Sequence, residues 1–122
     1  MSGHKYLADT NAFIFLLNRH PAIKPVLDSE WSYSFITEIE LKGKTGITTS
    51  ELKKVADLLS SCTKIPFTEE ISQHTISLRQ QYRIKIPDAI IAATSLYRNI
   101  PLLTFDKDFT LIKSLDIILL EP

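Results

Sequence analysis

The chain has 122 residues, a length that predicts a single domain over residues 1–122. Its 44% hydrophobic and 23% charged residues are typical of a folded globular protein and exclude a disordered chain or a fibre. Fourteen basic and fourteen acidic side chains give zero net charge at pH 7, which argues against a surface that attracts nucleic acid everywhere but not against a local site.

In the first half of the chain, strand patterns are followed by helical ones. The segment KYLA at 5–8 predicts a β-strand, and apolar residues on most faces of 10–19 predict a buried helix. A second strand at 31–36 gives way to a helix at Thr37. The spacing of apolar residues then predicts a helix that begins near Ser50, with Ser50 as its N-cap.

The same alternation continues toward the C-terminus. A short strand at 63–67 precedes a helix capped by Thr68, and Asp88 lies at the start of a further helix. Two more strands, at 101–105 and 116–120, follow on either side of a turn. This order predicts an α/β protein, a three-layer α/β/α fold with a mostly parallel central sheet.

Four acidic side chains fall at strand ends or helix starts in this order: Asp9, Glu40, Asp88 and Asp106. In sheets of this kind, ligands bind at the carboxyl ends of the strands. Each acid alone also has a purely structural explanation. Asp9 caps a helix well, Asp88 complements a helix dipole, Asp106 suits a turn, and Glu40 completes a capping box with Thr37.

Taken together, the four carboxylates predict a metal site. Unpaired carboxylates that crowd together repel one another and raise one another's pKa values. A hard cation relieves that repulsion, and ligation by oxygen alone suits Mg²⁺ or Mn²⁺. Such an ion activates water and stabilises the transition state of phosphodiester hydrolysis.

Four segments of the chain resemble PIN domains of the bacterial toxin type and are similar to VapC ribonucleases. The matching motifs keep their order along nearly the whole chain: Asp9-Thr10-Asn11, Glu40-Leu41, Asp88-Ala89 and Thr104-Phe105-Asp106. The resemblance implies a PIN-like fold and a metal-dependent endoribonuclease that hydrolyses RNA phosphodiester bonds, with Mg²⁺ or Mn²⁺ as its cofactor.

The resemblance also implies roles for individual residues. The four acids would be catalytic carboxylates and metal ligands, with Asp9 and Asp88 the most direct ligands. In the turn TFDKDF, Asp108 is the alternative to Asp106. The side chains predicted to orient ligands or bound water are Asn11, Thr104 and Ser34.

The charge count and the resemblance also lead to predictions about binding partners. Without the four acids, fourteen basic and ten acidic side chains leave a net charge of +4. The basic residues predicted to contact RNA phosphates are Lys42, Lys44, Arg83 and Lys85, with solvated helix faces as the alternative. The resemblance implies an RNA substrate, a cognate antitoxin protein whose tail covers the acidic cleft, and a homodimer, which many relatives form.

The remaining features exclude other kinds of site. A single cysteine, Cys62, excludes an intramolecular disulfide, and three scattered histidines do not have the spacing of zinc ligands. The apolar runs are too short to span a membrane, and no signal peptide is visible, so we predict a cytoplasmic protein with no membrane partner.

Two other α/β classes fit the sequence less well. A phospho-acceptor receiver domain needs an acidic pair after its first strand, and LADTN has none. A P-loop in KGKTG needs a glycine where Glu38 stands. The alternative that stays open is a catalytically silent PIN-like module that binds RNA or protein.

Overall fold

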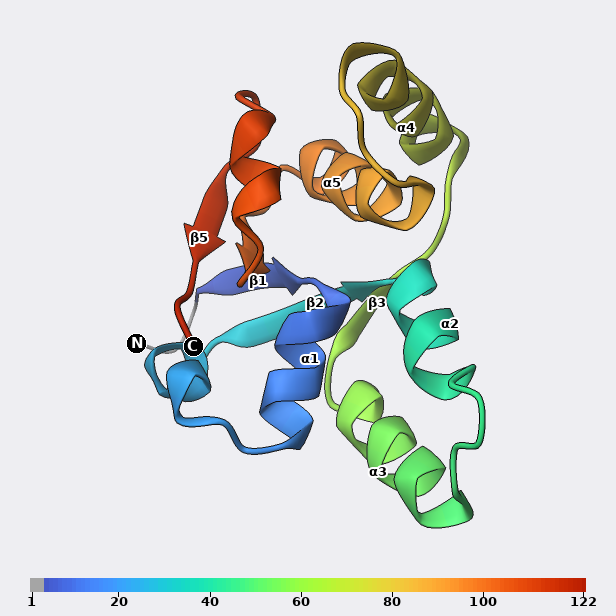
Figure 1. Ribbon diagram of the computed structural model, residues 1–122, viewed down its shortest axis with the longest axis vertical. Helices are drawn as coiled ribbons and strands as arrows, with labels where there is room; N and C mark the ends of the chain where they lie inside the picture. The colour runs from blue at the N-terminus through green and yellow to red at the C-terminus, as the bar shows by residue number, and fades with distance from the viewer. Residues whose placement is uncertain (1–3) are drawn as a thin grey trace.

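The computed structural model describes residues 4–122 and contains a five-stranded sheet (Figure 1). The strands are β1 (Lys5–Ala8), β2 (Glu30–Ser34), β3 (Thr63–Ile65), β4 (Leu102–Thr104) and β5 (Ile117–Leu119). They lie in the order β3-β2-β1-β4-β5, and each neighbouring pair is parallel. The predicted parallel sheet is therefore confirmed.

Helices connect the strands in nearly the predicted order. They are α1 (Thr10–Leu17), α2 (Phe35–Lys42), α3 (Thr49–Ser60), α4 (Glu69–Gln81) and α5 (Ile86–Arg98), with 3₁₀ helices η1 (Pro21–Val26) and η2 (Lys107–Leu111). The sequence did not predict η1, and η2 extends the turn predicted after β4. No helix within residues 4–122 is long and apolar enough to cross a membrane.

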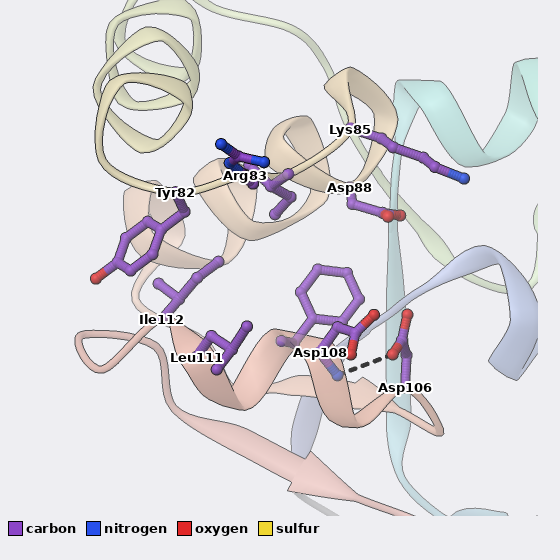
Figure 2. A pocket seen from close by; sticks show the side chains of 10 residues that line it. Tyr82, Arg83, Lys85, Asp88, Asp106, Asp108, Leu111 and Ile112 are labelled. Carbon is purple, nitrogen blue, oxygen red and sulfur yellow. Dashed lines mark hydrogen bonds between the residues drawn. The ribbon is translucent and has the colours of Figure 1, made fainter.

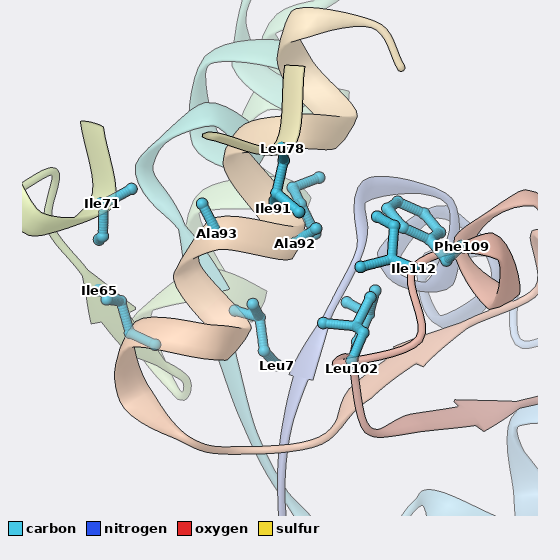
Figure 3. Packing of buried hydrophobic residues seen from close by; sticks show 11 residues of the cluster. Leu7, Ile65, Ile71, Leu78, Ile91, Ala92, Ala93, Leu102, Phe109 and Ile112 are labelled. Atoms are coloured by element: carbon cyan, nitrogen blue, oxygen red, sulfur yellow. The ribbon is translucent and has the colours of Figure 1, made fainter. Parts of the chain in front are cut away.

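Side chains that alternate along the strands build a core on each face of the sheet. Leu7 and Leu102 are fully buried on the face that α4, α5 and η2 cover (Figure 3). Their neighbours Ala8 and Leu103 pack on the opposite face, against α1, α3 and η1. Helices therefore flank the sheet on both faces, as the α/β/α prediction requires (Figure 1).

The sheet topology creates a crevice at the carboxyl ends of β1 and β4. From β1, the chain moves outward through β2 to β3 on one side, and β4 and β5 occupy the other side. The helix after β1 and the helices before β4 pack on opposite faces. This reversal of strand order is where open α/β sheets bind ligands.

The structure corrects where α2 begins. The Ser34 hydroxyl is the N-cap and accepts a hydrogen bond from the Ile36 backbone N–H at 3.2 Å. Because β2 ends at Ser34, Thr37 is buried within α2 and is not a cap. The capping-box explanation of Glu40 is therefore wrong.

The structure also moves the cap of α3 from Ser50 to Thr48. Thr48 Oγ1 accepts from the Glu51 backbone N–H at 3.0 Å, and the Glu51 carboxylate accepts from the Thr48 N–H at 3.1 Å. These reciprocal bonds form a capping box. Ser50, predicted as the cap, lies inside the helix.

Thr48→Ala should lower the free energy of unfolding by about 1 kcal/mol, because it removes the side-chain acceptor of this cap. Ser50→Ala is the matched control and should change stability by a few tenths of a kcal/mol at most, in line with ordinary surface substitutions. Urea denaturation followed by circular dichroism measures both, as a shift in midpoint at constant slope. An equal loss in the two variants would contradict the observed cap.

Candidate active site

Asp9 lies at the carboxyl end of β1, where two elements orient its carboxylate. The side chain is 5% exposed. Oδ1 caps α1 by accepting from the Ala12 backbone N–H at 2.8 Å, and Oδ2 accepts from the Thr104 hydroxyl at 2.5 Å. The carboxylate is therefore fixed between α1 and β4, and each oxygen keeps a further lone pair for a ligand.

The surroundings of Asp9 disfavour its ionised form. Burial raises the pKa of this carboxyl from its ordinary value of 3.8 to about 6, against the hydrogen bonds from Thr104 and Ala12, which lower it. The nearby Asp106 and Asp88 raise the pKa further. No basic side chain within residues 4–122 forms an ion pair with Asp9, so its charge is stabilised only by hydrogen bonds.

Asp88 reaches the same place from the first turn of α5. The helix starts at Ile86, with Lys85 as an N-cap whose side chain makes no capping hydrogen bond. Burial raises the pKa of Asp88, and Asp106 and Glu40 raise it further, whereas Lys85 lowers it. Within the described part of the chain, the Asp88 carboxylate has no hydrogen-bond partner, so its oxygens are available for a ligand.

Glu40 is held by a threonine for which the sequence predicted no role. Thr10 Oγ1 donates to Glu40 Oε1 at 2.6 Å and lies 3.1 Å from Thr37 Oγ1. Thr10 thereby links α1 to α2 and orients an otherwise exposed carboxylate. The position of Thr10 in the Asp-Thr-Asn motif is the sequence feature that could have indicated this role.

Asp106 is tied to Asp9 through Thr104. The Thr104 hydroxyl donates to Asp9 and accepts from the Asp106 backbone N–H at 3.0 Å. Asp106 Oδ1 accepts from the Asp108 backbone N–H at 2.8 Å and so caps η2 (Figure 2). The predicted orienting role of Thr104 fits this arrangement, since one hydroxyl connects the two strand-end acids.

The four predicted acids line one cavity of about 130 Å³. Its lining residues are Asp9, Thr10, Asn11, Glu40, Asp88, Ile91, Asp106 and Phe109. Asp108 is not among them, which favours Asp106 as the fourth carboxylate of the turn. Ser34 does not line the cavity either. It is fully buried and acts as the cap of α2, the helix that carries Glu40.

Two of the predicted phosphate-binding lysines have acidic partners on or near α2 and α3. Lys42 Nζ donates to Glu38 at 2.7 Å, one turn earlier on α2. Lys44 Nζ lies 3.5 Å from Glu51 on α3. Neither lysine lines the acidic cavity, so the structure gives both of them ion-pair roles.

The other two predicted cations lie beside the acids. Arg83 and Lys85 line a second cavity, of about 400 Å³, and Asp88 and Asp106 line both cavities (Figure 2). Arg83 and Lys85 make no ion pair with any residue from 4 to 122. The structure therefore places two of the four predicted cations in a cavity that Asp88 and Asp106 also line.

The donor set fits a hard divalent cation that keeps most of its water. Within residues 4–122, no three carboxylate, imidazole or thiol side chains are close enough together to hold one ion by themselves. Mg²⁺ does not need such a cage, because it usually takes one or two carboxylates and retains several waters. Asp9 and Asp88 supply two carboxylates with raised pKa values and no ion-pair partner, which is the chemistry a cation would stabilise.

Comparisons with known proteins agree with this fold. A family model described as the PIN domain matches residues 6–115. The chain is similar to a toxin-antitoxin complex from Klebsiella pneumoniae (29% identity, 93% of this chain and 95% of that chain, TM-score 0.80). It is also similar to VapBC-1 from nontypeable Haemophilus influenzae (27% identity, 94% and 97%, TM-score 0.78).

The likeness to a third solved structure supports only the fold, because the sequence identity is lower. This structure is VapBC2 from Rickettsia felis, bound to a DNA fragment from its promoter (21% identity, 96% of this chain and 99% of that chain, TM-score 0.82). No curated protein matches the chain.

Proposed function

The chain belongs to the PIN domain family, and from this premise we propose that it is a Mg²⁺- or Mn²⁺-dependent endoribonuclease. The observation that carries the proposal is the convergence of Asp9, Glu40, Asp88 and Asp106 on one small cavity. These acids come from four separate elements, and two of them have raised pKa values without an ion-pair partner. Acidic residues that served only as helix caps or turn residues would have no reason to line one cavity.

In this proposal, Asp9 and Asp88 hold the ion, and Glu40 and Asp106 face it from α2 and the β4–η2 turn. A bound Mg²⁺ or Mn²⁺ would polarise the scissile phosphate and lower the pKa of the attacking water. Thr104 keeps the Asp9 carboxylate in one orientation through its hydrogen bond. Thr10 occupies Glu40 Oε1 and leaves the second oxygen for a water molecule.

We also propose that the protein is the toxin of a toxin–antitoxin pair. The Klebsiella and Haemophilus relatives, at 29% and 27% identity, are a toxin-antitoxin complex and a VapBC complex. The partner would be an antitoxin protein that covers the acidic cavity, and a homodimer is the assembly that the resemblance predicts. Light scattering of the purified protein, alone and with the antitoxin, measures both assemblies.

The test of the nuclease is cleavage of a mixed cellular RNA pool by the purified protein. With Mg²⁺ or Mn²⁺ the RNA should be cut into discrete fragments, and EDTA should prevent the cutting. RNA that stays intact with either metal, although the protein binds it, would favour the silent RNA-binding module.

Asp106→Asn should slow cleavage by about 10- to 100-fold at low Mg²⁺ concentration, the scale at which groups around a metal act. The loss in Asp108→Asn should be at least about tenfold smaller, because this exposed residue does not line the acidic cavity. The initial rate on one RNA at several Mg²⁺ concentrations separates the two variants. A larger loss in Asp108→Asn would reassign the fourth carboxylate.

A further inference from the structure

The second cavity, lined by residues 82–85 on one wall and by residues within 108–112 on the other, shares Asp88 and Asp106 with the acidic site. Its volume of about 400 Å³ falls within the range of about 300–1,000 Å³ that holds small ligands. Because Asp88 and Asp106 line both cavities, a polymer whose phosphate sits at the acids must continue into a neighbouring space.

The wall at 82–85 alternates between anchors and cations. Tyr82 and Ile84 pack against the core that α4 and α5 share, whereas Arg83 and Lys85 are exposed. Arg79 fixes this segment by donating from Nη1 to the Ile84 carbonyl oxygen at 2.7 Å. The segment therefore presents Arg83 and Lys85 from a backbone that is anchored on α4.

The wall at 108–112 is mostly apolar. Phe109 and Ile112 are almost fully buried and contribute to the same core. Leu111, at the end of η2, is 66% exposed and lies beside Ile112 in the cavity (Figure 2). The cavity therefore has the carboxylates of Asp88 and Asp106 next to the acidic site, the exposed Asp108 at the start of an otherwise apolar wall, and the guanidinium of Arg83, which has no ion pair among residues 4–122.

We propose that this cavity is a nucleotide subsite, which binds the nucleotide next to the scissile phosphate of a single-stranded RNA. The base lies against Leu111, and Arg83 contacts the adjoining phosphate. The subsite rests on the proposed nuclease function. It extends that function by assigning the cavity into which the RNA chain runs from the acidic site.

A second groove also borders the acidic site, at Glu40, between α1, α2 and α3. Of its two lysines, Lys44 is paired with Glu51, at 3.5 Å, whereas Lys54 has no ion-pair partner among residues 4–122. The groove borders only one of the four acids, Glu40, whereas the cavity beside η2 borders two, and one of these is Asp88, a proposed ligand of the ion. This shared border with the proposed ion site favours the cavity beside η2 for the nucleotide.

The test measures binding of a fluorescent single-stranded RNA to Asp9→Asn protein, which keeps the RNA intact, with Mg²⁺ over a range of salt concentrations. Arg83→Gln should weaken binding about three- to tenfold and reduce the salt slope by about 0.7, the value for one lost phosphate contact on a single strand. Leu111→Ser should weaken binding about threefold or more, because it removes apolar surface that the base would cover, with an unchanged salt slope.

Matched controls lie away from the cavity. Arg98→Gln removes a charge at the opposite end of α5, and Leu27→Ser replaces a leucine that is 59% exposed after η1. Both should bind RNA like their parent. If the Arg83→Gln and Leu111→Ser proteins bind RNA as tightly as these controls, the subsite assignment is wrong. This conclusion holds even if the wild-type protein, which has Asp9, cuts RNA.

Two further arms separate the possible failures. Chains with Asp9 that leave RNA uncut in Mg²⁺ and Mn²⁺ would overturn the nuclease function, while the binding series still decides the subsite. Polyglutamate of matched length is the competitor for an acidic protein segment. If it displaces RNA at equal concentration and its binding shows the same dependence on Leu111, the cavity is a site for acidic chains and the nucleotide assignment is wrong.

Discussion

Asp9→Asn should abolish RNA cleavage while the protein remains folded. The substitution removes one carboxylate charge from the acidic cavity but keeps an oxygen that can cap α1 at the Ala12 N–H. We expect the rate to fall by at least about 10³-fold, the scale seen when one member of a catalytic unit is lost. Single-turnover cleavage of a labelled RNA at saturating Mg²⁺ measures this loss.

The matched control is Asp57→Asn on α3. Its carboxylate is exposed and pairs with Lys53 at 3.1 Å, away from the acidic cavity, so cleavage should continue at the wild-type rate. Far-ultraviolet circular dichroism should be unchanged in both variants, which excludes unfolding as the cause of the loss. If Asp9→Asn protein cuts RNA as fast as Asp57→Asn protein, Asp9 is not part of the catalytic site.

The meeting of the four acids was predictable because it follows from topology. In a parallel sheet, the carboxyl ends of the strands meet at one edge, so Asp9 and Asp106 had to lie close together once β1 and β4 were neighbours. Asp88 lies in the first turn of α5, and Glu40 lies on the short helix α2. Both helices start at that edge. The prediction needed the order of elements and did not need their exact bounds.

The hydrogen bonds around the acids were not predictable in the same way. Thr104 bonds to Asp9 across 95 positions of the sequence, and Thr10 bonds to Glu40 across 30. Such contacts depend on the registry of elements that pack together, which a pattern of apolar residues does not specify. Motif position predicted the role of Thr104, but no role was predicted for Thr10.

Local boundaries failed for a different reason. Ser34, Thr37, Thr48 and Ser50 are all good caps by composition, and the neighbouring structure chose among them. β2 pairs with β3 as far as Ser34, which places the start of α2 there. The pairing of Lys42 with Glu38 was available from the sequence, since residues four apart on a helix face each other.

In metal-free buffer, the wild-type protein should lose stability relative to Asp9→Asn protein as the pH rises from about 4 to 7. Burial raises the pKa of Asp9 to about 6 in the folded protein, from an ordinary 3.8. Between these values the folded state keeps a proton that the unfolded chain has lost. The free energy of unfolding therefore falls with rising pH, by up to about 3 kcal/mol in total, and this contribution is constant above the folded pKa.

The difference between the two proteins reports the titration of Asp9 together with its coupling to Asp88 and Asp106. The hydrogen bond with Thr104 lowers the pKa of Asp9 and so is part of the titration, whereas the bond between Thr104 and an asparagine does not depend on pH. Urea denaturation in EDTA at intervals from about pH 4 to pH 8 gives the two curves. Adding Mg²⁺ at neutral pH should restore stability to the wild-type protein and not to Asp9→Asn protein, since only a folded state with an intact site gains from the ion.

A stability difference that stays constant across this pH range would mean that Asp9 titrates like a solvated carboxylate. Burial would then not be the reason for this acid to bind a cation. Equal stabilisation of both proteins by Mg²⁺ would place the ion away from Asp9. The predicted result is a stability difference that grows with pH and that Mg²⁺ removes. It requires that the ionised Asp9 carboxylate destabilises the folded protein when no cation is bound, and that a bound Mg²⁺ removes this cost.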